Sequence, residues 1–474
     1  MPVILAIPFL VMIAVLRGMT VALPIFHGSD ELVYHYPTIL RFSRELPFPD
    51  LHSYRAAQTP LYQLLMAYSG KVVGYELWRL RLLQVLISYL LALAVFALLS
   101  RRLGMARSQA LALTLLFVIS PYVFGQSFRL GTDNLALLFS ILAIERFERF
   151  RECDRLGPFL TGCALVAGAM LTRQSAAFLV PLAVLYALRP GARVTRAERA
   201  TAVAGVALSV LPVGLLFLNW HGLVPVGGDP GSCGLCSASG SGGGLTLGGL
   251  EVQTMELTLA SIGIYGTVLF APQWIPRLRA DLAAGDGGGR LRAVASRPLI
   301  AALGGAVFLL LFPAKPTPEP AGVVWKVASH LPVIAGSSLL FWVLVPLSCA
   351  VLLLRIERAP RPWLVAVVAG CFLIAAIAIR YPWQKYVDPF SLLILLLTIG
   401  PNELRARWQL AGAAVLAVSF LAYTADYSSH KSTPRPRIAS VRTTTSTRGL
   451  LNQHLSAARS RRTDERRGEI GNRV

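Results

Sequence analysis

The chain has 474 residues, of which 55% are hydrophobic and only 15% are charged, and its formal net charge is +21. Soluble globular domains carry roughly 25% charged residues, so much of this surface does not face water and a soluble enzyme is excluded. The positive charge lies mostly in short Arg-containing segments between apolar runs. That pattern indicates membrane topology and contact with anionic lipid rather than nucleic acid.

Apolar runs long enough to cross a bilayer recur along the chain and predict an all-α polytopic protein with about 11–13 membrane-spanning helices. The first run, 3–26, lacks a preceding basic segment and exceeds the apolar core of a signal peptide, so we expect a retained span. Residues 60–75 are less apolar and are expected to lie at the interface or to re-enter. The further expected spans are 80–99, 109–125, 134–146, 159–171, 176–189, 201–219, 255–272, 298–313, 337–354, 363–379, 388–400 and 409–425. The region 159–189 forms either a broken pair or one long element.

The loops between these runs differ in basic residues, and this difference predicts the orientation. One set of loops holds 21 Arg residues, and the alternate set holds 9 Arg or Lys residues. The denser set comprises 101–107, 146–155, 189–199, 277–297, 355–361 and 405–407, and the other comprises 41–55, 129, 173, 315–326 and 380–385. Positive residues accumulate in cytoplasmic loops. The first set is therefore predicted to be cytoplasmic, and the second to face the periplasm, the cell exterior or a lumen.

The domain organisation is expected to be simple. Residues 1–425 form one multispan domain, and 426–474, rich in Arg, Ser and Thr, form a basic disordered tail. With thirteen spans this tail would lie on the non-cytoplasmic side, against the charge bias. Either one expected span does not cross the membrane or the tail escapes the rule.

Candidate chemistry lies in the non-cytoplasmic loops, which mix acidic, aromatic and cationic residues. Asp30 and Glu31 follow the first span, and a carboxylate at a membrane boundary can be partly desolvated, which raises its pKa toward that of a general base. Solvated loop charges are the alternative. Asp133 and Asn134 stand at an expected helix start, where either could be the N-cap. Arg129 beside them could pair with Asp133 or face a phosphate.

Two further segments on the predicted non-cytoplasmic side contain cationic residues. Arg173 interrupts an apolar region, where a charge normally faces a cavity or a partner. The loop 380–388 combines Arg380 and Lys385 with aromatic residues. Cations bind phosphate, and aromatic rings stack on sugars or form an interfacial belt. We expect Arg173, Arg380 and Lys385 to converge on one anionic site.

These motifs resemble a known group of enzymes. An Asp-Glu pair after the first span, followed by aromatic and His residues, resembles the opening of the GT-C glycosyltransferases, multispan enzymes that use a polyprenyl-phosphate-linked sugar as donor. The closest resemblance is to the dolichyl-phosphate-glucose alpha-1,2-glucosyltransferase family, which adds the last glucose to the lipid-linked N-glycan precursor. It rests on Asp30-Glu31, His35, Pro37, Gln58-Thr59-Pro60-Leu61-Tyr62, Thr132-Asp133 and Arg173-Gln174. The His is shifted by one residue, the second Pro and the Gly of that family's Thr-Pro-Pro-Gly-Leu-Tyr are absent, and the likeness fades beyond about residue 190.

The resemblance implies an inverting transfer of a hexose to a glycan or lipid acceptor on the non-cytoplasmic face. Asp30 or Glu31 would be the catalytic base, and Asp30 is preferred because it occupies the first position of the pair. The substrate-binding residues would be His35, Tyr62, Arg129, Asp133, Arg173, Gln174, Arg380, Trp383 and Lys385. No metal site is expected, with a divalent cation at Asp30 and Glu31 as the open alternative. The membrane would be the plasma (inner) membrane of a prokaryote or the endoplasmic reticulum of a eukaryote.

Two other functions fit a chain of this kind. A transporter or flippase of lipid-linked saccharides would also have many spans, outer aromatic residues and buried Arg, but transporters often show repeated halves, and no repeat is evident. An oligosaccharide-lipid ligase usually has its main site in a large late outer loop. The longest outer loop here, 219–254, is rich in Gly and poor in titratable residues.

Overall fold

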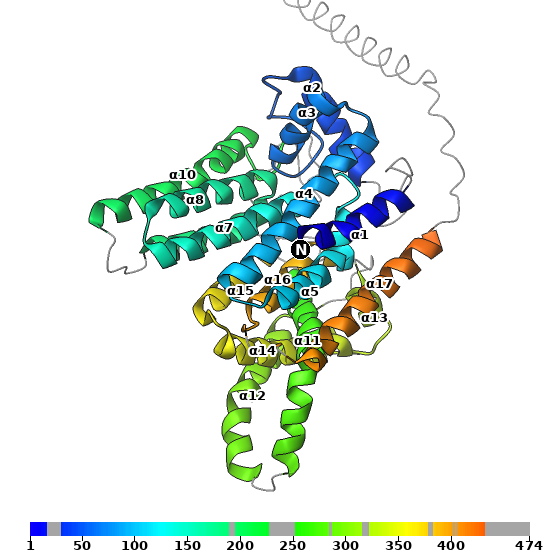
Figure 1. Ribbon diagram of the computed structural model, residues 1–474, viewed down its shortest axis with the longest axis vertical. Coiled ribbons are helices and arrows are strands. Elements are labelled where there is room, and N and C mark those ends of the chain that lie inside the picture. The colour runs from blue at the N-terminus through cyan, green and yellow to red at the C-terminus, as the bar shows by residue number, and fades with distance from the viewer. Residues whose placement is uncertain are drawn as a thin grey trace, which may run out of the picture. The chain divides into compact units, whose positions relative to one another are not determined.

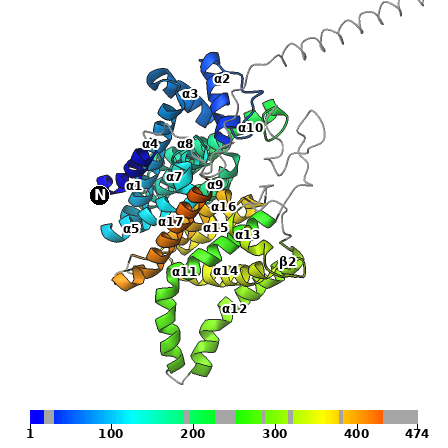
Figure 2. The ribbon, with the colours of Figure 1, turned by 90° about the vertical axis from the view of Figure 1, so that its right-hand side faces the viewer.

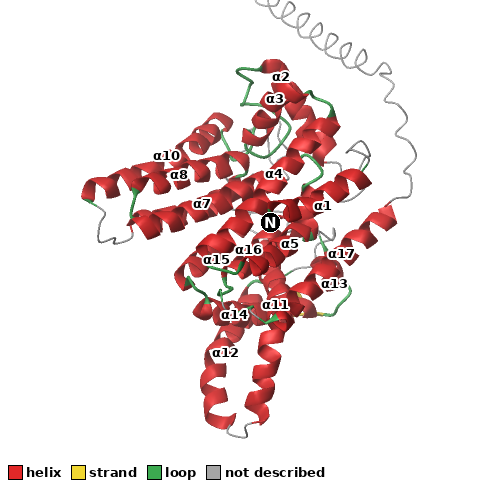
Figure 3. Ribbon diagram, viewed as in Figure 1, coloured by secondary structure: helices red, strands yellow, loops and turns green. Residues whose placement is uncertain are grey.

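The computed structural model describes residues 1–16, 30–188, 195–226, 252–283, 287–314, 322–377, 383–401, 403–404 and 406–431. Helices make up nearly all of this part, and its one sheet is the antiparallel pair β1 (Val333–Ile334) and β2 (Ser337–Ser338) (Figure 3). The all-α prediction is confirmed. The chain divides into two units, Met1–Ala425 and Asp426–Val474. The second unit is described only to residue 431. Residues 426–431 of the expected disordered tail are helical, because they continue the helix that precedes them, and the rest of the tail lies outside the described residues.

The first helical group follows the order of the sequence. It contains α1 (Pro2–Val15), α2 (Tyr36–Glu45), α3 (Leu61–Val73), α4 (Leu77–Ala97), α5 (Arg107–Ile119), α6 (Pro121–Gln126), α7 (Asp133–Cys153), α8 (Leu156–Thr172), α9 (Leu179–Leu188) and α10 (Arg196–Trp220). Short turns η1 (Glu31–His35), η2 (Leu98–Arg102) and η3 (Gln174–Phe178) join some of them. Helices α4, α7, α8 and α10 pack side by side in that order (Figure 1).

The second group packs around α11, and η3 and α9 contact its helix α15. It contains α11 (Gln253–Ala283), α12 (Gly287–Leu311), α13 (Val323–Ser329), α14 (Leu339–Arg358), α15 (Pro362–Ala376) and α16 (Gln384–Leu397). After a short turn, η6 (Arg407–Leu410), helix α17 (Ala411–Lys431) follows and runs across the boundary between the two units. The lower ends of α11 and α12 extend away from the other helices (Figure 2).

The expected spans correspond to helices, with instructive differences in length. Five segments are long and apolar enough to cross a membrane by length and composition: Leu77–Arg102, Arg196–Trp220, Gln253–Pro276, Leu339–Arg358 and Trp408–Asp426. Six shorter apolar helices accompany them in the described part of the chain. The expected span 109–125 is split at Pro121, which lacks the N–H that helix continuation needs. The second half of the first expected span, from residue 17, lies outside the described residues.

Ion pairs join three of the Arg-rich loops at one end of the first group. Arg102 pairs with Glu145 and Glu152, each at 2.6 Å. Buried Glu148 accepts hydrogen bonds from Arg361 at 2.7 Å and from the Tyr186 hydroxyl. The predicted cytoplasmic loops 101–107, 146–155 and 355–361 therefore lie together, as loops on one membrane face must.

Candidate active site

A π-helical turn places the two adjacent acids in different surroundings. The turn η1 (Glu31–His35) begins directly after Asp30, and both Glu31 and His35 are buried. The Asp30 side chain keeps 31% of its surface exposed, whereas that of Glu31 keeps 3%. Such turns are frequent at functional sites. Of the pair, only Asp30 is open to a substrate.

Glu31 is fully occupied by structural partners. Arg81, at the start of α4, donates to its carboxylate twice, from Nε at 2.9 Å and from Nη2 at 2.6 Å. The backbone N–H of Leu130 donates a third hydrogen bond at 2.8 Å. This paired fork geometry is a strong, directional interaction. Glu31 thus ties the first outer segment to α4 and to the segment before α7, and its part in catalysis stays a prediction.

Asp30 instead meets the first turn of α16. Lys385 Nζ lies 2.7 Å from Asp30 Oδ2, although the two residues are 355 positions apart. The same ammonium lies 4.2 Å from the ring centroid of Trp383 and 5.1 Å from that of Tyr386. The two rings stack with centroids 5.8 Å apart. The cation is therefore held between a carboxylate and two aromatic faces, which limits its orientations.

A second cation reaches the same aromatic pair. The Arg173 guanidinium carbon lies 4.4 Å from the centroid of Tyr386, and Arg173 forms an ion pair with Asp133 at the start of α7. Arg173 and Lys385 therefore approach one ring, and their shared role at an anionic site stays a prediction. Arg380, the third member of that prediction, lies outside the described residues. Asp133 is not the N-cap of α7, which is Thr132.

The aromatic and imidazole residues of the motif line the inner side of this cluster. His35 and Tyr62 are buried, with ring centroids 6.1 Å apart. Gln63 Nε2 lies 3.3 Å from His35 Nδ1. The Tyr62 hydroxyl donates to Gln84 at 2.9 Å and accepts from the N–H of Gly131 at 3.1 Å. The Tyr62 hydroxyl thereby supports the segment that carries Arg129 and Asp133.

Electrostatics set the protonation of the two titratable groups that face the cluster. Burial of the Asp30 carboxyl raises its pKa, but attraction and a hydrogen bond from Lys385, with help from Arg129, outweigh burial and hold the pKa below the usual 3.8. Burial lowers the pKa of His35 to about 4; Asp30 opposes this shift, and three nearby cations reinforce it. At neutral pH Asp30 is therefore ionised and His35 is neutral.

Two expected binding residues have other partners. Arg129 does not pair with Asp133; its Nε donates to Gln126 Oε1 at 3.1 Å, while its charge still acts on Asp30. Gln174 Nε2 donates to the carbonyls of Ala57 at 2.8 Å and Leu223 at 3.1 Å, a structural bridge. Within the described ranges no three His, Cys, Asp or Glu side chains form a metal-binding group. A divalent cation at Asp30 and Glu31 stays a prediction.

Sequence reasoning missed Arg81 and gave Tyr386 no role. Arg81 lies inside the expected span 80–99, and a charge in an apolar run is a signal that it faces a partner. Tyr386 lies in the first turn of α16, within the segment expected as an aromatic loop, and the sequence does not distinguish it from an interfacial belt residue. With these two included, four segments distant in sequence meet at one place: 30–35, 129–133, 173 and 383–386.

Comparison with known proteins supports a transferase. Residues 57–217 match the family described as dolichyl-phosphate-mannose-protein mannosyltransferase, which is of the GT-C type. No curated protein and no solved structure gives a significant match. The matched segment includes Tyr62, Arg129, Asp133 and Arg173. The match and the apolar helices together indicate a multi-pass integral membrane glycosyltransferase with a GT-C-like fold.

Proposed function

We propose that this protein transfers a hexose from a polyprenyl-phosphate-linked donor to a glycan or lipid acceptor on the non-cytoplasmic face of its membrane. The observation that carries the proposal is the Asp30–Lys385 pair beside Arg173, at 2.7 Å and around a shared tyrosine ring. One accessible carboxylate and two cations are the groups that a direct displacement at an anomeric carbon requires. The matched family also uses a lipid-phosphate sugar, as its description states.

The proposed reaction is a single inverting displacement. The acceptor hydroxyl oxygen forms a bond to the anomeric carbon while the bond from that carbon to the phosphate oxygen breaks. Asp30 takes the hydroxyl proton, and the lipid phosphate leaves with the bonding electrons. Arg173 and Lys385 stabilise the phosphate charge as it develops. A single base without a covalent intermediate gives inversion, unlike the paired carboxylates of retaining hydrolases.

The pairing of Asp30 with Lys385 suggests how the base is held before the donor arrives. An ion-paired carboxylate with a depressed pKa is a weak base. A donor phosphate competes with Asp30 for the Lys385 ammonium, because both are anions. Transfer of Lys385 to the phosphate would leave Asp30 partly buried without its cation, which raises its basicity when the acceptor is in place.

The donor experiment uses the full chain in lipid nanodiscs. Polyprenyl-phosphate mannose and polyprenyl-phosphate glucose are supplied separately, each with a lipid-linked saccharide, a free glycan or a Ser/Thr-containing peptide. We expect release of polyprenyl phosphate that depends on one sugar and one acceptor class. The family description favours mannose, and the opening motif favours glucose. Failure of every donor and acceptor combination, together with movement of a labelled lipid-linked saccharide between leaflets, would replace this proposal with the transporter alternative.

Lys385→Met tests the pairing through the pH dependence of activity. Lys385 lowers the pKa of Asp30, while burial raises it. Removing the ammonium should therefore move the acid limb of the pH–rate profile to higher pH and weaken binding of the donor. The measurement is the pH profile of kcat/KM alongside donor affinity. Lys326→Met is the matched control, because Lys326 is an exposed lysine of α13 in the expected outer set. An acid limb that does not move would show that Lys385 does not tune the base.

A further inference from the structure

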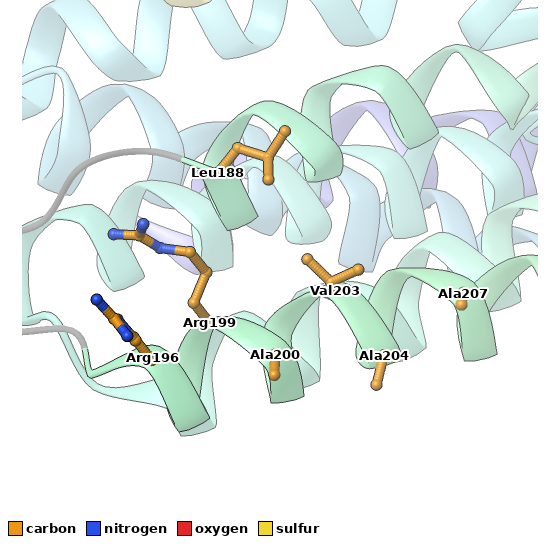
Figure 4. A pocket seen from close by; sticks show the side chains of 7 residues that line it. All are labelled: Leu188, Arg196, Arg199, Ala200, Val203, Ala204 and Ala207. Carbon is orange, nitrogen blue, oxygen red and sulfur yellow. The ribbon is translucent and has the colours of Figure 1, made fainter.

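A groove lies between the end of α9 and the first three turns of α10, far from the site above. Its volume is about 480 Å³, and it is lined by Leu188, Arg196, Arg199, Ala200, Val203, Ala204 and Ala207. Figure 4 shows the Arg199 side chain rising from α10 toward the end of α9, with Arg196 beside it at the mouth. The rest of the lining is aliphatic. The groove thus has a cationic mouth and an apolar floor.

The dimensions of this groove match one membrane leaflet. From Arg196 to Ala207 the helix rises roughly 16 Å, and one leaflet contributes about half of a hydrocarbon core about 30 Å thick. Small residues on successive turns, Ala200, Ala204 and Ala207, leave room for a chain against the helix. Helix α10 is one of the candidate spans, so its first turn stands at a membrane boundary. An acyl chain fits the floor, and its headgroup would reach the mouth.

The charges at the mouth favour an anion. Within the described ranges, no carboxylate lies within 4 Å of the Arg196 or Arg199 guanidinium. The nearby Glu198 is engaged elsewhere: it accepts from the Thr195 N–H at 2.8 Å and from the Thr195 hydroxyl at 3.0 Å. That capping box already satisfies the helix N-terminus. An anion at the mouth would therefore be held by the two guanidinium groups.

We propose that this groove binds an anionic phospholipid of the leaflet that faces the Arg-rich loops. The phosphate is held by Arg196 and Arg199, and one acyl chain lies along α10 against Val203. Arginine forks match phosphate geometry, and basic residues at the end of a span attract anionic lipid at about 1 kcal/mol each. The groove lies at the opposite end of α10 from Trp220, whose Nε1 donates to the Leu51 carbonyl in the first outer segment. It is therefore separate from the sugar-transfer site.

The test measures lipid retention by the full-length chain after purification in detergent. Phosphatidylglycerol and phosphatidylcholine with identical acyl chains are added, and the bound lipid is counted by native mass spectrometry. The double variant Arg196→Gln/Arg199→Gln should bind phosphatidylglycerol about 30-fold more weakly. The variant Val203→Trp should also lose the lipid, because it fills the groove without changing charge. Inorganic phosphate should not displace the lipid, since it lacks the chain.

The control removes the same charge at exposed arginines elsewhere. Arg101→Gln/Arg149→Gln should retain phosphatidylglycerol as the wild type does. Three results would overturn the proposal. These are equal retention of phosphatidylcholine and phosphatidylglycerol, equal losses in the control and the groove variants, or displacement by inorganic phosphate. The last result would identify a free-anion site. Thermal unfolding of each variant shows whether a loss reflects misfolding, and the two groove variants test the mouth and the floor separately.

Discussion

Replacing Asp30 with Asn is expected to lower the turnover of sugar transfer by roughly 10²–10⁴-fold, the range for removal of a general base. The amide keeps the shape of the side chain but cannot accept the proton of the acceptor hydroxyl at neutral pH. Donor affinity should hold or improve, because Lys385 loses its carboxylate partner and is free for phosphate. The measurement is kcat under saturating donor and acceptor, with donor affinity determined separately.

A matched control for this substitution lies in the same outer segment. Asp50 is an exposed acid that pairs with Arg41 at 3.2 Å and accepts the His52 N–H at 2.8 Å. Asn can accept the same backbone hydrogen bond, so Asp50→Asn should keep near-normal turnover. Near-normal turnover in Asp30→Asn as well would remove Asp30 from the chemistry. A loss confined to donor affinity would make it a binding residue instead.

Breaking the Glu31–Arg81 pair from one side is expected to destabilise the fold by about 3–5 kcal/mol, because it leaves a buried charge without its partner. Both side chains are almost wholly buried, with 3% and 4% of their surface exposed. Among the described residues, Arg81→Met leaves the Glu31 carboxylate with the Leu130 N–H as its one remaining donor. The double variant Glu31→Leu/Arg81→Met should lose less stability than either single variant. Thermal unfolding of the purified chain in one detergent measures all three.

The exposed pair Glu76–Arg79 provides the control. Glu76 directly precedes α4, and Arg79 lies in the first turn of that helix. Its atoms lie 3.2 Å apart, with 54% and 41% of the side-chain surfaces exposed. Exposed pairs contribute about 0–1 kcal/mol, so Glu76→Gln should leave unfolding nearly unchanged. If Glu31→Gln and Glu76→Gln behave alike, Glu31 does not anchor the site. The distinction between Glu31 as a structural residue and Asp30 as the accessible acid would then be wrong.

Hydropathy located the helices but not their ends. The expected span 134–146 is the helix α7, which continues to Cys153 through Glu145, Glu148 and Arg151. An apolar run ends at the membrane boundary. The hydrogen-bonded helix can continue beyond that boundary where its charged side chains find partners, as Glu148 does with Arg361. For the same reason the composition could not foresee α13 or the short β1–β2 hairpin, which depend on local packing.

The sequence by itself determined that this is a helical membrane protein. The length of an apolar run and the charge of a loop are local properties, and each interacts directly with the bilayer. The sequence also selected the polar segments around Asp30, Asp133, Arg173 and Lys385. Only the tertiary structure decided which partner each of these side chains meets. Asp30 and Glu31 are adjacent and chemically alike, yet one meets Lys385 and the other meets Arg81, partners 355 and 50 positions away. Whether a carboxylate is accessible or buried in a structural pair depends on which cation packs against it. That packing is fixed by contacts between distant helices.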